Sequence, residues 1–148
     1  MSLLLRLWMV CALLLPALPA AAVVVPESFS RLDLTPSLQW LPQPSVDTLA
    51  AARAQDDAFI DIIDDANLGR LPGAWWFRTE LHNAAPVARD LLLAVEFDKL
   101  EQVDLYLVRA GVPTERFRSG TGLPFAARPV ATAGHLFPLP LAPGETVT

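Results

Sequence analysis

The feature that most constrains this chain is a series of short apolar runs that follow one another too closely for crossover helices to fit between them. Turn-forming pairs such as Ala110-Gly111 and Pro143-Gly144 separate the runs. Short strands joined in this way predict an all-β fold, an antiparallel sandwich or barrel. The five predicted strands are Trp75–Leu81, Asp90–Phe97, Val103–Val108, Thr114–Arg118 and Leu136–Leu141.

Side chains alternate between the two faces of a strand, so three of these runs divide into a core face and an outward face. Burying one large apolar side chain is worth about 1.5–3 kcal/mol, which assigns the more apolar face to the core. The predicted core set is Trp75, Phe77, Thr79, Leu81, Leu91, Leu93, Val95, Phe97, Val103, Leu105 and Leu107. If the strands are neighbours, the outward face gathers Trp76, Arg78, Glu80, Glu96, Asp104 and Tyr106.

Aromatic rings beside charged groups are the chemistry with which a flat sheet holds a sugar. The ring stacks on the apolar side of a pyranose, while arginine and carboxylate groups bond its hydroxyls. The outward face is therefore a candidate ligand site. The alternative, which the frequency of packing aromatics favours, is structural: Trp76 and Arg78 lie under the N-terminal segment, with Arg78 paired to Glu80 or Glu96.

The first 22 residues have the layout of a secretory signal peptide. Arg6 precedes an apolar stretch, and Ala20-Ala21-Ala22 offers a small-residue cleavage site. An uncleaved anchor is the alternative, because apolar residues continue to Val25, although the unbroken apolar core is shorter than the ~20 residues of a membrane span. We therefore expect an exported protein, with its domain over residues 23–148. Cys11 lies in the leader, so no disulfide is expected in the mature chain.

The segment from Pro26 to Gln55 carries weaker signals. A brief alternation interrupted by Pro36 predicts a short edge strand. Ser45 or Asp47 then offers an N-cap for a short surface helix in the alanine-rich stretch that follows.

Charge and residue type exclude several functions. Without Arg6 the chain has 10 basic and 16 acidic residues, a net charge of 10 − 16 = −6, which argues against nucleic acid as a partner. The aspartates Asp56, Asp57, Asp61, Asp64 and Asp65 suggest calcium, but Asp65, Asn67 and Gly69 only half match a calcium loop. We expect a solvated acidic surface instead, and no metal or other cofactor.

The sequence offers few residues in arrangements suited to catalysis. Glu80 and Glu96 could form the carboxylate pair of a glycosidase only if their separation across a cleft were right. His82 and His135 belong to no recognisable nucleophile motif. We expect a binding or structural module and no enzyme.

The sequence closes on Glu145 to Thr148, which read as the start of another strand. A sheet ending there would expose an unpaired edge. Either a strand is missing or another chain covers the edge, and a homodimer is one such arrangement.

Five motifs in order carry a family resemblance: LDLTPSLQWL, NLGRLPGAWWFRTELHN, VDLYLV, SGTGLPFAARP and HLFPLPL. Together they resemble the extracellular domain of type 2 of bacterial seven-transmembrane receptors with diverse intracellular signalling modules (7TMR-DISM extracellular 2). The resemblance runs from Arg31 to the last residue. It implies a jelly-roll β-sandwich, similar to carbohydrate-binding modules, in the periplasm, or on the periplasmic face of the inner membrane if the full-length receptor exists. Receptors of this kind commonly end in a histidine kinase or a diguanylate cyclase.

The resemblance also maps positions. Trp76 and Arg78 match a recurring Trp-x-Arg, and Asn83 and Tyr106 match an asparagine and a tyrosine of the pattern. The loop before the later strands matches at Gly120, Pro124, Phe125 and Arg128. With Arg128 added, the candidate ligand-binding residues are Trp76, Arg78, Glu80, Glu96, Tyr106 and Arg128.

The resemblance implies further strands and membrane helices after Thr148, whereas the sequence as given has no later apolar segment of spanning length. We therefore expect a C-terminally incomplete sensor domain that binds a small molecule or saccharide. Two alternatives are a structural or dimerisation module and, least favoured, a glycan-cleaving enzyme.

Overall fold

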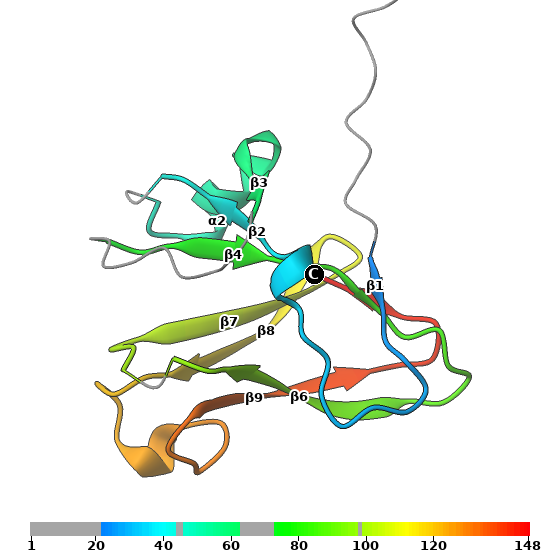
Figure 1. Ribbon diagram of the computed structural model, residues 1–148. Coiled ribbons are helices and arrows are strands. Elements are labelled where there is room, and N and C mark those ends of the chain that lie inside the picture. Colours follow the sequence, from blue (N-terminus) through cyan, green and yellow to red (C-terminus); the bar gives the residue numbers. More distant parts are fainter. Residues whose placement is uncertain (1–21, 44–45, 63–72, 98) are drawn as a thin grey trace, which may run out of the picture.

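The computed structural model describes residues 22–43, 46–62, 73–97 and 99–148, and strands dominate them (Figure 1). The strands are β1 (Val23–Val24), β2 (Gln39–Leu41), β3 (Ile60–Asp61), β4 (Trp76–Arg78), β5 (Leu81–His82), β6 (Arg89–Val95), β7 (Val103–Arg109), β8 (Val112–Ser119), β9 (His135–Leu141) and β10 (Thr146–Val147). The helical pieces are α2 (Leu49–Arg53) and three single 3₁₀ turns, η1 (Thr35–Ser37), η2 (Asp56–Ala58) and η3 (Phe125–Ala127). The prediction of an all-β fold is confirmed.

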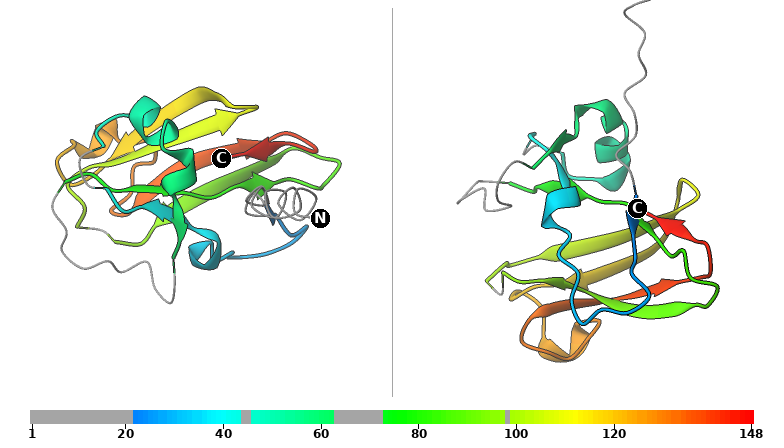
Figure 2. Two further views of the ribbon diagram at one scale, coloured as in Figure 1. Left: turned by 90° about the horizontal axis from the view of Figure 1, so that it is seen from above. Right: turned by 45° about the vertical axis from the view of Figure 1, so that its right-hand side comes forward.

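The strands form three sheets. One has the order β1-β5-β10-β7-β8, the second the order β3-β2-β4, and the third consists of β6 and β9. In Figure 1 and in the right-hand view of Figure 2, β7 and β8 lie between the β6–β9 pair below and the β3-β2-β4 sheet above. This layering agrees with a β-sandwich, with the three-stranded sheet added on its outer side.

The main core lies between the five-stranded sheet and the β6–β9 pair. Its buried members are Val25, Leu81, Leu107, Leu139, Leu141 and Val147. Strand β9 shows why: His135, Phe137, Leu139 and Leu141 are buried, while the residues between them are more open. In β6 the predicted inward positions Leu91, Leu93 and Val95 are half-buried and alternate with exposed ones, as expected. Phe97 is exposed, contrary to prediction, because β6 ends at Val95.

The predicted strand Trp75–Leu81 is divided between two sheets. Its first part is β4, which pairs with β2, and its second part is β5, which pairs with β10 and β1. The prediction that Phe77 faces the core and Trp76 faces outward was therefore wrong for β4. Trp76 packs against a second buried cluster of Leu41, Val46 and Ala52, whereas Phe77, predicted to be inward, is 42% exposed.

The reason for this inversion lies in what covers β4. Its partner β2 places Leu41 opposite Trp76 and Trp40 opposite Phe77. The apolar cover of this sheet comes from Val46 and from Ala52 of α2, not from the sandwich interior. Trp75 is half-buried and lies against Trp40, with ring centroids 5.3 Å apart.

Other N-terminal elements also differ from expectation. Strand β2 is the middle strand of its sheet rather than an edge strand, because Pro36 falls in η1 and leaves β2 free of proline. Helix α2 forms where a short helix was predicted, but its N-cap is Thr48, whose side chain accepts a hydrogen bond from the Ala51 N–H at 3.2 Å. Ser45 lies outside the described residues.

Strand β1 supplies a parallel pairing that the sequence did not indicate. Val23 and Val24 lie beside Leu81 and His82, and the Val25 N–H donates to the His82 carbonyl at 2.9 Å. The valines that follow the alanine-rich stretch are therefore part of the folded sheet. The predicted leader before Ala22 lies outside the described residues. Within the described part of the chain, no helix has both the length and the apolar character needed to cross a membrane.

Strand β10 lies inside the five-stranded sheet, between β5 and β7. Val147 pairs with Leu81 on one side and with Arg109 on the other. The prediction of a strand in this segment is confirmed, but the prediction that it leaves an unpaired edge was wrong, since the edges of this sheet in the described residues are β1 and β8. The sequence could not show this, because the order of strands in a sheet is set by tertiary pairing.

Candidate functional site

The structure brings together two of the six predicted site residues, Trp76 and Tyr106. Their ring centroids are 5.7 Å apart at an interplanar angle of 31°. Trp76 comes from β4 and Tyr106 from β7, so the contact joins the three-stranded sheet to the sandwich. Tyr106 alternates with the core residues Leu105 and Leu107, which places its ring on the face of β7 that points away from the core.

Trp76 has a packing role as well. Its indole Nε1 donates to the Val46 carbonyl at 2.6 Å, and the ring covers the cluster around Leu41. The structural alternative is thus confirmed for this part of the side chain, because the residues that cover Trp76, Leu41, Val46 and Ala52, belong to the N-terminal segment. The rest of the ring is turned toward Tyr106.

Two arginines that the sequence analysis did not single out complete this surface. Arg116 of β8 lies over the Tyr106 ring, 5.3 Å from its centroid. Arg116 and Arg118 both bind Asp104 of β7, at 3.1 and 2.7 Å. Their alternation in Thr114–Arg118 was a usable signal, but that run was too polar to be divided into faces. We call the set Trp76, Tyr106, Asp104, Arg116 and Arg118 the Tyr106 face.

The carboxylate of Asp104 is the electrostatic centre of this face. Partial burial raises its pKa, but hydrogen bonds from Arg118, Gln102 and Arg116 outweigh burial, so the pKa of Asp104 lies below its usual range. In turn, the hydrogen bond and charge of Asp104 raise the pKa of Arg118. Asp104 and Arg118 are therefore both ionised at neutral pH.

Arg78 lies elsewhere. Its Nε donates to Gln39 Oε1 at 2.8 Å, its Nη1 binds Asp56, and its guanidinium lies 4.3 Å from the centroid of Phe59. These contacts fasten β4 to β2 and to η2. The predicted partners, Glu80 or Glu96, were wrong.

The other three predicted residues have separate surroundings. Glu96 forms a surface ion pair with Arg31 at 2.8 Å. Arg128 donates to the Thr132 carbonyl at 3.1 Å within the loop before β9. Glu80 is half-buried between β4 and β5, and its backbone carbonyl accepts from Val23 at 2.7 Å.

A buried polar pair that the sequence did not reveal links β8 and β9. Ser119 Oγ lies 2.9 Å from His135 Nδ1, and both side chains are almost completely buried. No residue of the described chain partners His135 Nε2. A serine beside a histidine resembles a nucleophile and its base. Because a substrate has no access to either group, the pair is part of the interior rather than a catalytic site.

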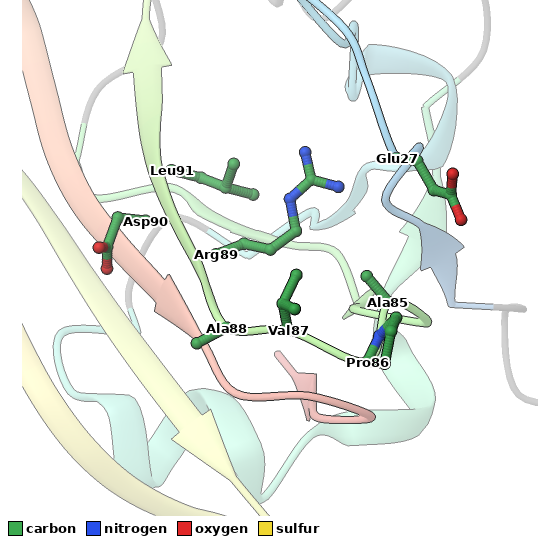
Figure 3. A pocket seen from close by; sticks show the side chains of 8 residues that line it. All are labelled: Glu27, Ala85, Pro86, Val87, Ala88, Arg89, Asp90 and Leu91. Atoms are coloured by element: carbon green, nitrogen blue, oxygen red, sulfur yellow. The ribbon is translucent and has the colours of Figure 1, made fainter.

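A surface hollow with a volume of about 380 Å³ lies at the start of β6 (Figure 3). Arg89 extends across it from one wall and Glu27 lies on the other side. The Arg89 guanidinium already donates to the Pro26 carbonyl and lies over the Phe29 ring. The lining otherwise consists mainly of small apolar residues. None of it belongs to the Tyr106 face, which offers more groups for recognition.

Metal ligands are not grouped in residues 22–43, 46–62, 73–97 or 99–148, where no three His, Cys, Asp or Glu side chains come close enough to hold an ion. Asp64, Asp65, Asn67 and Gly69, which suggested calcium, lie outside these ranges.

Comparison with known proteins gives one result. The sequence model of the 7TMR-DISM extracellular 2 family matches residues 42–148. No curated protein and no solved structure matches the chain. The matched region contains β4 to β10 and the whole Tyr106 face. The chain therefore belongs to the 7TMR-DISM extracellular 2 family, exported sensor domains of seven-transmembrane receptors.

Proposed function

We propose that this sensor domain binds a small extracellular ligand on the Tyr106 face, and that a saccharide fits this face best. The observation that carries the proposal is the grouping of Tyr106 with an indole and a guanidinium, whose centres lie 5.7 and 5.3 Å from its ring centroid, on the outward face of β7. An aromatic ring offers a stacking surface for a sugar, and neighbouring arginine and carboxylate groups supply hydrogen bonds to its hydroxyls.

The same contact suggests how occupancy is passed on. Besides the Trp76–Tyr106 contact, a hydrogen bond from Arg53 Nη2 to the Gly111 carbonyl, at 2.6 Å, joins the α2 region to the β7–β8 turn. A ligand lying across Trp76 and Tyr106 favours one position of the three-stranded sheet relative to the sandwich. Signalling to the receptor's membrane region is then a population shift between two such positions.

Binding is tested by titrating the purified protein with a panel of oligosaccharides, followed by tryptophan fluorescence and calorimetry. Tyr106→Ala should weaken binding of the responding sugar at least tenfold, because the central stacking surface is lost. Tyr106→Phe should retain most of it. Phe77→Ala is the matched control, since Phe77 is an exposed aromatic of β4 outside the Tyr106 face. Unchanged binding by a folded Tyr106→Ala variant would refute the proposed site.

We also propose that the domain is not a catalyst. Of the two carboxylates that could serve glycoside cleavage, Glu96 is engaged in a surface ion pair with Arg31. Incubation of the same oligosaccharides with the protein should leave them intact by chromatography. Hydrolysis that disappears in Glu96→Gln would contradict this proposal.

A second candidate function, self-association, is favoured by the outer face of β6 and β9. Leu92 is 60% exposed, and it pairs across the ladder with Pro138, with Ala94 and Pro140 nearby on the same face. A second copy could cover this apolar surface with its own. Sedimentation velocity should then show a dimer that Leu92→Lys dissociates. A monomer at all concentrations would exclude it.

A further inference from the structure

The Tyr106 face is more positive than the protein that carries it. Its charged members are Arg116, Arg118 and Asp104, a local sum of 2 − 1 = +1, whereas the whole chain has a formal charge of −5. The two arginine side chains are 50% and 44% exposed, and Asp104 is only 18% exposed. A ligand approaching this face therefore meets guanidinium groups before it meets the carboxylate.

Asp104 holds both arginines in place. Its Oδ1 accepts from Arg118 Nε at 2.7 Å, and its Oδ2 accepts from Arg116 Nη2 at 3.1 Å and from Gln102 Nε2 at 2.8 Å. Arg118 Nη2 adds a longer contact to Oδ2 at 3.4 Å. An arginine already held by a carboxylate loses less rotamer freedom when a ligand binds. The face is thus preorganised.

Donor groups remain available on both guanidiniums. An arginine has five N–H donors, and in the described part of the chain Arg116 uses Nη2 alone while Arg118 uses Nε and Nη2. The two residues are i and i+2 on one strand, so they stand on the same face about 6.5–7 Å apart. Planar N–H groups with this placement suit the two oxygens of a carboxylate, which arginine binds more strongly than a neutral acceptor.

Resting on the ligand-binding function proposed above, we propose that the Tyr106 face recognises an acidic saccharide. The sugar ring lies against Tyr106, and the carboxylate of its uronic acid binds the free N–H groups of Arg116 and Arg118. Asp104 acts as a positioning residue for the two arginines. A neutral saccharide offers its hydroxyls to the same donors but gains no charge-assisted hydrogen bond.

The test compares uronic-acid oligosaccharides of the gluco, galacto and manno series with their methyl esters, which differ in charge and hardly in shape. The acid should bind the native protein at least tenfold more tightly than its ester, and raising the salt concentration should reduce this difference. Arg118→Gln and Arg118→Lys should both remove most of the preference, because lysine lacks the planar fork. Arg31→Gln, a surface arginine paired with Glu96, is the matched control and should keep it.

Each other outcome identifies which proposal fails. Acid and ester binding equally well, with Arg116→Gln and Arg118→Gln neutral, would overturn the acidic preference and leave saccharide binding intact. Sulfate or acetate competing fully, with no effect of Tyr106→Ala on acid binding, would show a bare anion site and overturn the saccharide. Failure of every acid and ester to bind a folded protein would overturn both proposals. Thermal denaturation of each variant verifies that it is folded.

Discussion

Replacing Asn83, a polar residue of the interior, should destabilise the domain strongly. Asn83 is fully buried between β5 and the turn that precedes β6. Its Nδ2 donates to the carbonyls of Val87 and Ala142, both at 2.9 Å, and its Oδ1 accepts from the Ala85 N–H at 3.2 Å. One side chain thus joins the loop before β6 to the turn after β9.

The magnitude follows from these three hydrogen bonds. At a net value of about 1 kcal/mol each, Asn83→Ala should lower the free energy of unfolding by about 3 kcal/mol. That is a large part of the ~5–15 kcal/mol typical of a domain, and it corresponds to a loss of roughly 6–12 °C in Tm for a chain of this length. Urea denaturation followed by tryptophan fluorescence should show a lower midpoint at an unchanged slope.

Two further variants test the reasoning. Asn83→Asp keeps the acceptor for Ala85 but sets a carboxylate against the carbonyls of Val87 and Ala142, so it should be at least as unstable at pH 7 and recover partly on acidification. Gln102→Ala loses one exposed hydrogen bond and should change stability by less than about 0.5 kcal/mol. A loss below about 1 kcal/mol in Asn83→Ala would refute the assignment of these hydrogen bonds.

Three other perturbations probe the core, the backbone and the charges. Leu141→Ala should cost about 2–5 kcal/mol in the same denaturation assay, because it opens a cavity in the main core. Gly120→Ala should yield little soluble folded protein, since Gly120 has a φ of 142° and a Cβ there would collide with the Glu101 backbone, whereas Gly111→Ala is strained only by its φ of 75°, meets no atom, and should fold with a smaller loss of stability. The pKa of Asp104 is lower in the folded than in the unfolded protein, so its carboxylate contributes to the free energy of unfolding above about pH 4, and this contribution is lost as the pH falls through the folded pKa. Asp104→Asn should therefore flatten the decline of stability in acid. Equal acid slopes for the two proteins, measured by urea midpoints, would contradict this.

The sequence predicted a strand correctly where the whole run stays in one sheet, because its alternating apolar residues then all face the same core. Arg89–Val95 carries large apolar residues at every second position facing the core, and it was located to within two residues. Trp75–Leu81 also alternates, but its pattern cannot show that β4 and β5 join different sheets. The break at Thr79 and Glu80 depends on pairing with β2 and β10, which lie far away in the sequence.

The candidate site was predictable to a similar degree. Trp76 and Tyr106 stood out as aromatics on strands, and the structure places them in contact. Arg116 and Arg118 were missed because a polar strand gives no apolar face from which to assign the other. Arg78 and Glu96 were placed beside them only on the assumption that all strands share one sheet, and in the structure their partners are Asp56 and Arg31.

The position of β10 has a consequence for how the protein is made. His82 and Thr146 lie side by side although 64 residues separate them. A ribosome therefore releases β5 and β7 well before the strand that belongs between them, and during that interval their facing backbone groups have only water as a partner. The emerging polypeptide should remain open until this segment arrives, a state suited to a chain that is threaded through a translocation channel before it folds.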